Sequence, residues 1–425
     1  MRILLTAAAL GELPGSAVAE AMARGWREVN ASAVIDASGS SDGDCGLLDA
    51  VEAARGGSRE VLTVLRGDAP DPRAPEPVPV VVLLAGGSAY LETRDVLGVA
   101  GSAPEAERTT TAREGSSFGV GQVVLAAIER GARRVVLGSG TPATLDAGTG
   151  LLRALAGREP APFDPGAAEA DLAAVLAAAR SRCDGAELVL LAPEPVLARG
   201  LRGAASRLTD ALGASESQQL DARLTALVKW YAELLPRRRD LLGPGGTGAV
   251  DAAAPQASLS GPPGSGSGGG LGLAVLALGG RVEAGPAFVA AECGLAGRAE
   301  GADLVVVLAD ELDPAEADRG VTAAVAGAAA THGVAVLALA RRVRLERRTA
   351  ASAGISATAT LAPSVAGEPA ATARARAAVD LDADAVAALA HRHARAWRWL
   401  APRDRVVTRC GSEPVAGRGR RTIER

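Results

Sequence analysis

Short aliphatic and β-branched runs recur along most of the chain, and helix-like sequence follows most of them. Ser16 to Asn30 is one such helical segment, with Val18, Met22 and Trp26 at helical spacing behind Ser16 as a candidate N-cap. Eight runs have this β character: 2–6, 33–37, 78–85, 134–138, 187–192, 303–309, 334–340 and 358–362. A repeated strand-helix alternation predicts a doubly wound α/β architecture.

The composition favours helices packed closely on a parallel sheet. At about 150 residues per domain, the 425 residues suggest two or three domains. The chain is 48% hydrophobic but only 2% aromatic, so Ala, Val and Leu must build its cores. A long helix is predicted from about Ser215 to Leu235, with a core-type stripe made of Leu220, Leu224, Leu227, Val228, Tyr231, Leu234 and Leu235.

Charge and hydropathy exclude several kinds of partner. A net charge of -4 and the lack of basic, aromatic-rich stretches argue against nucleic-acid binding. No apolar run reaches the roughly 18 residues of a membrane span, and the opening MRILLTAAALGELPG is interpreted as a strand in preference to a signal peptide. The basic tail, 401–425, is predicted to be disordered, with a weak polyanion contact as the alternative.

The cysteines point to a reducing compartment. Cys45, Cys183, Cys293 and Cys410 lie far apart, without the paired spacing of a zinc site or a disulfide framework. A cytoplasmic location is therefore expected.

Two segments interrupt the strand-helix alternation. The Pro-rich stretch from Arg66 to Pro79 is predicted to cross between domains. The stretch from Pro236 to Gly270 turns rich in Gly, Ala, Pro and Ser before the helix-like LGLAVLALGG. It is either a flexible linker or, at its end, a glycine loop whose N–H groups face an anion.

Several common chemistries do not fit the sequence. A Walker A loop requires a lysine after its second glycine, whereas the single lysine, Lys229, lies inside the long predicted helix. The stretch GSGTPA fits a relaxed dinucleotide pattern, but no strand with a terminal acid follows it at the required distance, so an NAD site is a minor alternative. His332, His391 and His393 have no Gly-x-Ser-x-Gly elbow nearby, which leaves a hydrolase triad unsupported.

Glycine and aspartate clusters at strand ends favour phosphoryl transfer. Glycines let backbone amides approach phosphate oxygens, and aspartates hold Mg²⁺ or accept the proton of an attacking hydroxyl. Open α/β sheets bind ligands at these ends. The clusters are SSDGDCG at 40–46, GSSFGVGQ at 115–122, GSGTPATLDAGTG at 138–150, GSGSGGG at 264–270 and ADELD at 309–313.

The order of these clusters resembles the glycerate kinase family of bacterial ATP-dependent enzymes. That family has a helix, a strand and the loop GIGGSATNDGGAGMLQALG, where this chain has GVGQVVLAAIERGARRVVLGSGTPATLDAGTGLLRALAG without a gap. The family loop PGAGAAGGLG appears as PGSGSGGGLG at 263–272. GADLVVV at Gly301 and THGVAV at Thr331 match two later strands, so the resemblance reaches to about Trp399.

The resemblance implies two α/β domains with the active site in a cleft. A Rossmann-like domain would be built from both chain ends, 1–65 and 275–400, with a second α/β domain inserted at 66–274. ATP and Mg²⁺ are the implied cofactors and a glycerate-like hydroxy acid the implied substrate. Asp42, Asp146 and Asp313 would be catalytic, with Asp42 and Asp146 also holding the metal. The implied phosphate- and substrate-binding residues are Gly138, Gly140, Thr144, Gly148, Gly266, Gly269 and Gly270.

The chain departs from the family at several charged positions. The turn Pro-Asp-Ser-Phe-Lys-Gly-Ser is replaced by TAAALGELPGS, and Cys45 replaces an acid in Asp-Gly-Gly-Glu-Gly-Thr. Pro142 and Leu145 replace Ser and Asn, only Pro195 remains of Asp-Val-x-Asn-Pro, and Gly320 stands in place of a lysine.

These departures leave two functions open. Arg113, Arg202 or Arg319 could supply the missing cations, which gives an ATP-dependent kinase acting on a hydroxyl of glycerate or a related acid. Arg and Lys are not interchangeable at fixed geometry, however. The alternative is therefore a catalytically degenerate paralogue that binds a ligand or protein through the same cleft. The sequence leaves the oligomeric state open.

Overall fold

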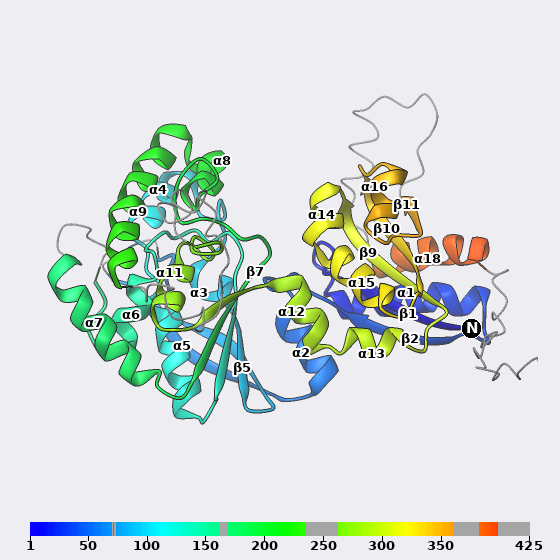
Figure 1. The fold of residues 1–425 in the computed structure, drawn as a ribbon, viewed down its shortest axis with the longest axis horizontal. Helices are drawn as coiled ribbons and strands as arrows, with labels where there is room; N and C mark the ends of the chain where they lie inside the picture. The colour runs from blue at the N-terminus through cyan, green and yellow to red at the C-terminus, as the bar shows by residue number, and fades with distance from the viewer. Residues whose placement is uncertain (70, 72–73, 162–167, 235–261, 361–381, 398–425) are drawn as a thin grey trace, which may run out of the picture.

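Two β-sheets organise the chain, each at the centre of its own lobe (Figure 1). The computed structural model describes residues 1–69, 71, 74–161, 168–234, 262–360 and 382–397. We call the lobe around the five-stranded sheet the terminal lobe, because its strands come from both ends of the chain, and the lobe around the six-stranded sheet the inserted lobe.

The terminal lobe has a parallel sheet in the order β11-β10-β9-β1-β2. Its strands are β1 (Arg2–Ala7), β2 (Val34–Gly39), β9 (Leu304–Leu312), β10 (Ala335–Val343) and β11 (Ala357–Thr360). Ile3 and Leu5 pack into one apolar core while Leu4 packs into the other, because successive side chains of a strand point to opposite faces. Both faces of this sheet are thus covered, which explains its nearly continuous apolar strands.

Helices of the terminal lobe form two layers. One layer contains α1 (Gly15–Val29) and α18 (Ala383–Trp397), and the other contains α13 (Leu295–Ala299), α15 (Val321–Ala330) and α16 (Arg347–Ser352), with α14 (Pro314–Arg319) after β9. A Cβ on Gly25 of α1 would overlap the carbonyl oxygen of Ala387 in α18, so this glycine permits close helix packing. The abundance of small residues serves tight packing here.

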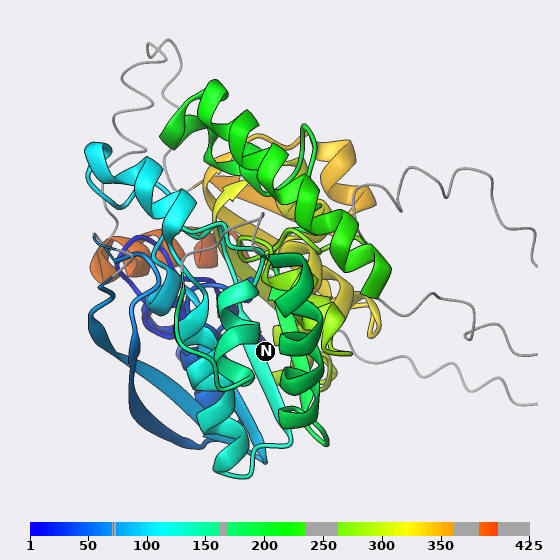
Figure 2. The same ribbon diagram turned by 90° about the vertical axis from the view of Figure 1, so that its left-hand side faces the viewer.

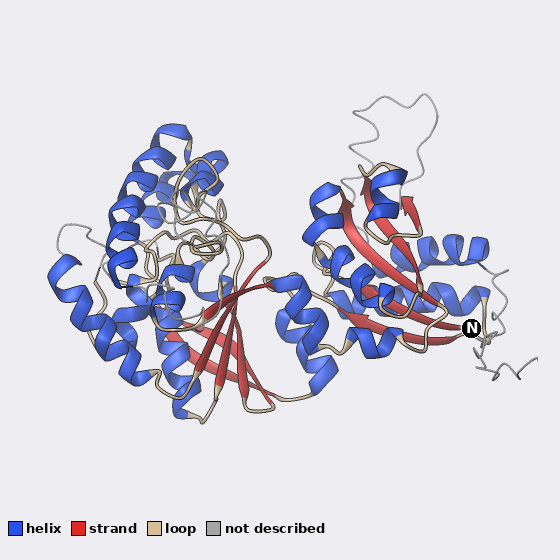
Figure 3. Ribbon diagram, viewed as in Figure 1, coloured by secondary structure: helices blue, strands red, loops and turns tan. Residues whose placement is uncertain are grey.

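The inserted lobe has a mixed sheet in the order β3-β4-β5-β6-β7-β8, in which β5 to β8 are parallel and β3 and β4 run antiparallel to their neighbours. The strands are β3 (Ser58–Leu65), β4 (Pro77–Ala85), β5 (Ser88–Glu92), β6 (Arg134–Gly138), β7 (Glu187–Ala192) and β8 (Arg281–Ala284). Loops gather beyond one end of these strands (Figure 3).

Helices cover both faces of the six-stranded sheet. One face carries α5 (Phe118–Glu129), α6 (Thr149–Leu155), α7 (Ala168–Arg182) and α11 (Leu271–Ala277), and the other carries α2 (Leu47–Arg55) and α12 (Gly285–Glu292). The short elements α3 (Arg94–Leu97), α4 (Glu105–Glu114), η1 (Ala205–Leu208) and α8 (Thr209–Leu212) complete the lobe with the long α9 (Ala214–Leu234). Figure 2 shows α9 crossing the lobe beyond the strands.

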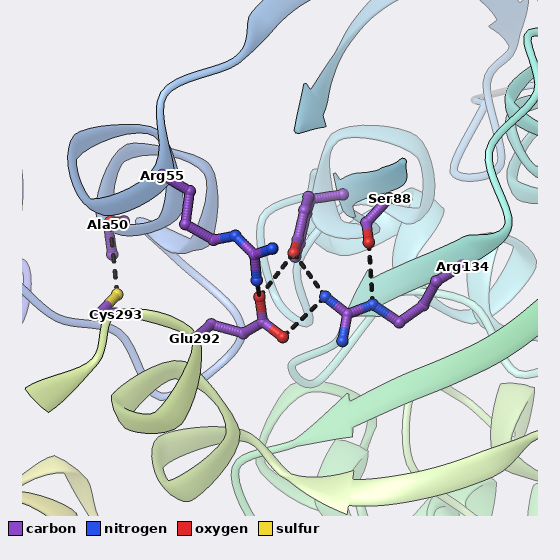
Figure 4. A network of polar contacts seen from close by, with 7 residues as sticks. Ala50, Arg55, Ser88, Arg134, Glu292 and Cys293 are labelled. Atoms are coloured by element: carbon purple, nitrogen blue, oxygen red, sulfur yellow. Dashed lines mark hydrogen bonds and ion pairs between the residues drawn. The ribbon is translucent and has the colours of Figure 1, made fainter. Parts of the chain in front are cut away.

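A polar network ties α2 and α12 to the inserted sheet (Figure 4). Glu292 of α12 pairs with Arg55 of α2 and, at 2.7 Å, with Arg134 at the start of β6. Tyr90 donates a hydrogen bond of 2.8 Å to Glu292, and Arg134 donates one of 3.0 Å to Ser88 Oγ. Only 9% of the Glu292 side chain is exposed, so this carboxylate is compensated inside the structure.

The structure confirms the fold class and has a strand at each of the eight predicted runs, as well as helices at 15–29 and 214–234 and the helix after the second glycine loop. Residues 235, 361 and 362 of these predictions lie outside the described residues. Three strands, β3, β5 and β8, lie outside the predicted runs. Ser16 is not the N-cap, because α1 starts at Gly15 behind Pro14.

The Pro-rich stretch does not cross between lobes. The stretch lies between β3, which ends at Leu65, and β4, whose first three residues are Pro77 to Pro79, and these strands are antiparallel neighbours in the inserted sheet. Residues 70, 72 and 73 of the stretch lie outside the described residues. Strands β3 and β8 fall inside the predicted ranges 1–65 and 275–400, yet both belong to the six-stranded sheet. Because α2 and α12 also pack on that sheet, we propose that the inserted domain extends from about residue 47 to about residue 293. The predicted tail, 401–425, lies outside the described residues.

Candidate functional site

Loops from both lobes meet at the carboxyl ends of parallel strands. The SSDGDCG loop, which follows β2, packs against the end of β6, where a Cβ on Gly138 would overlap the carbonyl oxygen of Gly43. Likewise, a Cβ on Gly140 would overlap the Asp44 carboxylate. The glycines of β6 and its loop therefore allow the two lobes to approach at this edge.

The two glycine loops pack directly on each other. Ala147 donates a 3.1 Å hydrogen bond to the carbonyl oxygen of Gly269, and a Cβ on Gly270 would lie 2.6 Å from the Cα of Ala147. Gly269 has a positive φ of 69°, and a Cβ there would overlap the Thr144 carbonyl oxygen. The residues from Pro262 to Gly270 therefore form a packed glycine loop, and its contact with an anion stays a prediction. Residues 235–261 lie outside the described residues.

Close packing accounts for most of the predicted phosphate-binding residues. Gly140 is half-buried, whereas six are buried: Gly138, Thr144, Gly148, Gly266, Gly269 and Gly270. A Cβ on Gly148 would overlap Ala274, and one on Gly266 would overlap the Leu197 carbonyl oxygen. These glycines are required for the loop shape with or without a ligand, and their contact with phosphate stays a prediction.

A small pocket opens between the two glycine loops. It has a volume of only about 20 Å³ and is lined by Gly140 and Thr141 from the first loop, by 266–269 from the second, and by Arg207 of η1. Among the described residues, no hydrogen-bond acceptor is recorded for the N–H groups of Gly140, Thr141, Gly268 and Gly269. Unpaired amides beside a guanidinium suit an anion.

Asp146 holds the first glycine loop in place. Its Oδ2 accepts hydrogen bonds from Ser117 N, Ser117 Oγ and Gly150 N at 2.7, 2.8 and 3.0 Å, and its Oδ1 accepts one from Gly148 N at 2.9 Å. Burial raises the pKa of Asp146, while these hydrogen bonds oppose the rise. A carboxylate buried with four donors has little capacity left for Mg²⁺, so its surroundings do not fit the predicted metal role.

Asp42 and Asp313 both lie in loops that follow strands of the terminal sheet, Asp42 after β2 and Asp313 after β9. Asp313 follows β9 and is the N-cap of α14, accepting a 2.8 Å hydrogen bond from Glu316 N. Burial raises the pKa of Glu316, and the charges of Asp42 and Asp313 raise it further. Glu316 is therefore within electrostatic range of both aspartates, and β9 and β1 flank the point where the strand order reverses, where open sheets bind ligands.

Two more carboxylates, missed by the sequence reasoning, extend this acidic region. Burial raises the pKa of Asp44 to about 6, and the charge of Asp42 adds to the rise. Burial likewise raises the pKa of Glu92, at the end of β5, to about 7. Arg94 lies 3.9 Å from Asp44. Asp44 belongs to the predicted SSDGDCG cluster, but Glu92 had no signal because β5 was not predicted.

The three arginines predicted to replace the missing lysines differ in their contacts and exposure. Arg113 is engaged by Glu216 and, at 2.7 Å, by Gln219, and Arg202 is exposed. Arg319 lies 3.7 Å from Glu194, which also pairs with Arg207. Arg207 and Glu194 were not among the sequence candidates, since no spacing links them to the glycine loops.

The described residues contain no group of three or more His, Cys, Asp and Glu side chains that could hold a metal. Mg²⁺ brought with a nucleotide needs only one or two protein carboxylates, because phosphates and water complete its shell. Asp42 and Asp313 fit this requirement, since each has one oxygen committed to a backbone N–H. Within the described part of the chain, no helix is long and apolar enough to cross a membrane.

Comparison with known proteins gives a consistent picture. The model of the glycerate kinase family matches residues 10–391. Two proteins described only as uncharacterized, from Mycobacterium bovis (strain ATCC BAA-935 / AF2122/97) and Mycobacterium tuberculosis (strain CDC 1551 / Oshkosh), are 30% identical over 373 residues, covering 85% of this chain and 84% of theirs.

A solved structure has the same fold. The crystal structure of "putative glycerate kinase 2" from Salmonella typhimurium LT2 superposes with a TM-score of 0.68 at 20% identity, covering 94% of this chain and 98% of that one. Together with the family match over nearly the whole chain, the shared architecture shows that the chain is a divergent member of the glycerate kinase family.

Proposed function

We propose that the protein is an ATP-dependent kinase that phosphorylates a hydroxyl of glycerate or a related small hydroxy acid. Family and fold support a kinase-like function. The observation that carries the proposal is the pocket between the glycine loops, where unpaired amides and Arg207 favour phosphate, close to the carboxylates of the SSDGDCG loop. A small-molecule acceptor and a cytoplasmic location belong to the same proposal.

In this proposal the two lobes have separate tasks. The amides of Gly140, Gly268 and Gly269, with Arg207, hold and neutralise phosphate oxygens. Asp42 and Asp313 orient the acceptor hydroxyl and take up its proton, and they provide the carboxylates for Mg²⁺. ATP supplies the phosphoryl group, and Mg²⁺ neutralises its charge. Asp146 acts through the first glycine loop, which it positions.

A coupled ADP-release assay with D-glycerate and Mg·ATP tests the proposal. We expect turnover by the wild type and a loss of about 10²- to 10⁴-fold in kcat in Asp42→Asn and Asp313→Asn. Asn caps a helix about as well as Asp, so Asp313→Asn keeps the N-cap of α14 and isolates the charge. Asp184→Asn, on an exposed loop before β7, is the control that should retain full activity.

One observation favours the degenerate paralogue as second candidate. The loop after β1, where the family has an Asp and a Lys, buries Leu10 in the terminal core. If wild type and Asp313→Asn show the same background ADP release while calorimetry detects nucleotide binding, the kinase proposal is wrong and the binding function stands.

A further inference from the structure

Two arginines from different lobes meet at one carboxylate. Arg207, in η1 of the inserted lobe, pairs with Glu194 Oε2. Arg319, at the end of α14 in the terminal lobe, has its Nη2 3.7 Å from Glu194 Oε1. Helix α14 faces the inserted lobe in Figure 1. Glu194 therefore links the two lobes through a pair of guanidinium groups.

The backbone of Glu194 is fixed, but its side-chain pairs are open to water. Its carbonyl oxygen accepts hydrogen bonds from Val196 N at 2.9 Å, within the loop after β7, and from Ser267 Oγ at 3.3 Å, in the second glycine loop. The side chains of Arg207, Glu194 and Arg319 are 44%, 36% and 48% exposed. Ion pairs this exposed are weak, so another anion can replace the carboxylate.

The surroundings suit an anion larger than a carboxylate. Arg207 lines the same pocket as Gly268 and Gly269, whose N–H groups have no acceptor among the described residues. Guanidinium groups bind phosphate bidentately, and a phosphoryl group offers more acceptor oxygens and more charge than Glu194 does. Of the two arginines, Arg207 lines this pocket, so a phosphoryl group held by both arginines would lie on the Arg207 side of it.

We propose that Glu194 occupies the place of a phosphoryl group: a di- or polyanionic phosphate ligand displaces its carboxylate and takes over Arg207 and Arg319, bridging the lobes. The choice of a phosphate ligand rests on the proposed function. In this proposal Glu194 competes with the ligand for the two arginines. Removing its charge should therefore raise the affinity for phosphate, whereas removing a residue that binds the ligand lowers it.

Isothermal titration calorimetry of the full chain with pyrophosphate, without nucleotide or Mg²⁺, measures this competition. We expect Glu194→Gln to bind pyrophosphate about 3- to 10-fold more tightly, because an amide does not hold the arginines by charge. Arg207→Gln should bind at least about 10-fold more weakly, and Arg319→Gln several-fold more weakly. The matched controls Glu60→Gln and Arg130→Gln break an ion pair of similar exposure elsewhere on the inserted lobe and should leave affinity unchanged.

The outcome separates this proposal from the kinase proposal. Tighter binding by Glu194→Gln without any turnover of D-glycerate would support the arginine site and reject the kinase. Normal turnover with unchanged or weaker pyrophosphate binding by Glu194→Gln would overturn the arginine site alone. Absence of pyrophosphate binding in both wild type and Glu194→Gln would overturn it as well.

Discussion

Asp146 accepts hydrogen bonds from both the backbone N–H and the hydroxyl of Ser117, at 2.7 and 2.8 Å. Ser117 is the N-cap of α5, while Gly148, which also donates to Asp146, is the N-cap of α6. One buried carboxylate thus serves the amino ends of two helices, where the helix dipoles favour a negative charge. This joint fixes the first glycine loop on the body of the inserted lobe.

Asp146→Asn should destabilise the protein. The amide cannot accept all four hydrogen bonds, because its NH₂ group must face a donor. We expect a loss of about 2–4 kcal/mol in the free energy of unfolding of the inserted lobe. Ser117→Ala, which removes only the hydroxyl, should cost about 1–2 kcal/mol. Urea unfolding followed by circular dichroism checks both. If Asp146→Asn abolished turnover but left the stability unchanged, Asp146 would instead have a direct catalytic role.

The packing of the glycine loops makes a prediction at Gly266. This residue has no left-handed φ, so Gly266→Ala tests space alone, and its Cβ would overlap the Leu197 carbonyl oxygen. We expect destabilisation of about 1–3 kcal/mol. Gly327→Ala in α15, where a Cβ meets nothing within 4 Å, should instead stabilise by about 0.5–1 kcal/mol. Thermal unfolding compares the two variants. If Gly266→Ala left the stability unchanged, the loop would have shifted to accommodate the added methyl group.

The raised pKa of Glu92 predicts how the stability of the protein depends on pH. Its pKa is raised to about 7 by burial, from an ordinary 4.5, so the folded protein binds more protons than the unfolded chain between these values. Stability should therefore fall as pH rises from about 4.5 through 7. Glu92→Gln should match the wild type near pH 4.5 and exceed it at pH 8 by on the order of 1 kcal/mol.

Differential scanning calorimetry from pH 4.5 to 8 measures this difference, with the exposed Glu60→Gln as a control whose offset does not vary with pH. A Glu92→Gln curve parallel to that of the wild type would contradict the raised pKa.

The network around Glu292 predicts how firmly α12 is attached. Glu292→Gln leaves the charges of Arg134 and Arg55 without their common partner, and Arg134 is only 22% exposed. We expect a loss of about 2–4 kcal/mol. Glu60→Gln breaks a pair in which both side chains are about 40% exposed, and should cost about 1 kcal/mol or less. Hydrogen exchange of the α12 amides, together with urea unfolding, checks this. Equal effects of both variants would mean that the network adds nothing to α12.

The fold was largely predictable because its strands are buried on both faces. A strand such as β9 must be apolar at nearly every position, which gives a recognisable run. Strands β3, β5 and β8 lacked this signal. β3 begins with the polar residues Ser58, Arg59 and Glu60 and is buried only at Leu62 and Val64, and β5 and β8 have five and four residues. Without β3, the following Pro-rich stretch was wrongly interpreted as a crossing between domains.

The candidate site was predictable only in its loops. The glycine and aspartate clusters marked the ends of the strands, and the charges of Asp42 and Asp313 each act on Glu316, whose pKa is raised mainly by burial. Their catalytic use stays a prediction. The sequence around Asp146 is that of a ligand-binding residue. Its hydrogen bonds to Ser117 and to its own loop could not be predicted, because they depend on how the chain folds in three dimensions.

By itself the sequence determined the alternation of strands and helices, the reliance on small core residues and the positions of the glycine loops, because these depend on local periodicity and on the conformational freedom of glycine. Only the tertiary structure decided which loops meet. It placed Arg207 and Arg319 on the same carboxylate, although 112 residues separate them in the chain. This contact depends on how the two sheets and their covering helices pack, so it cannot be predicted from the spacing of residues along the chain.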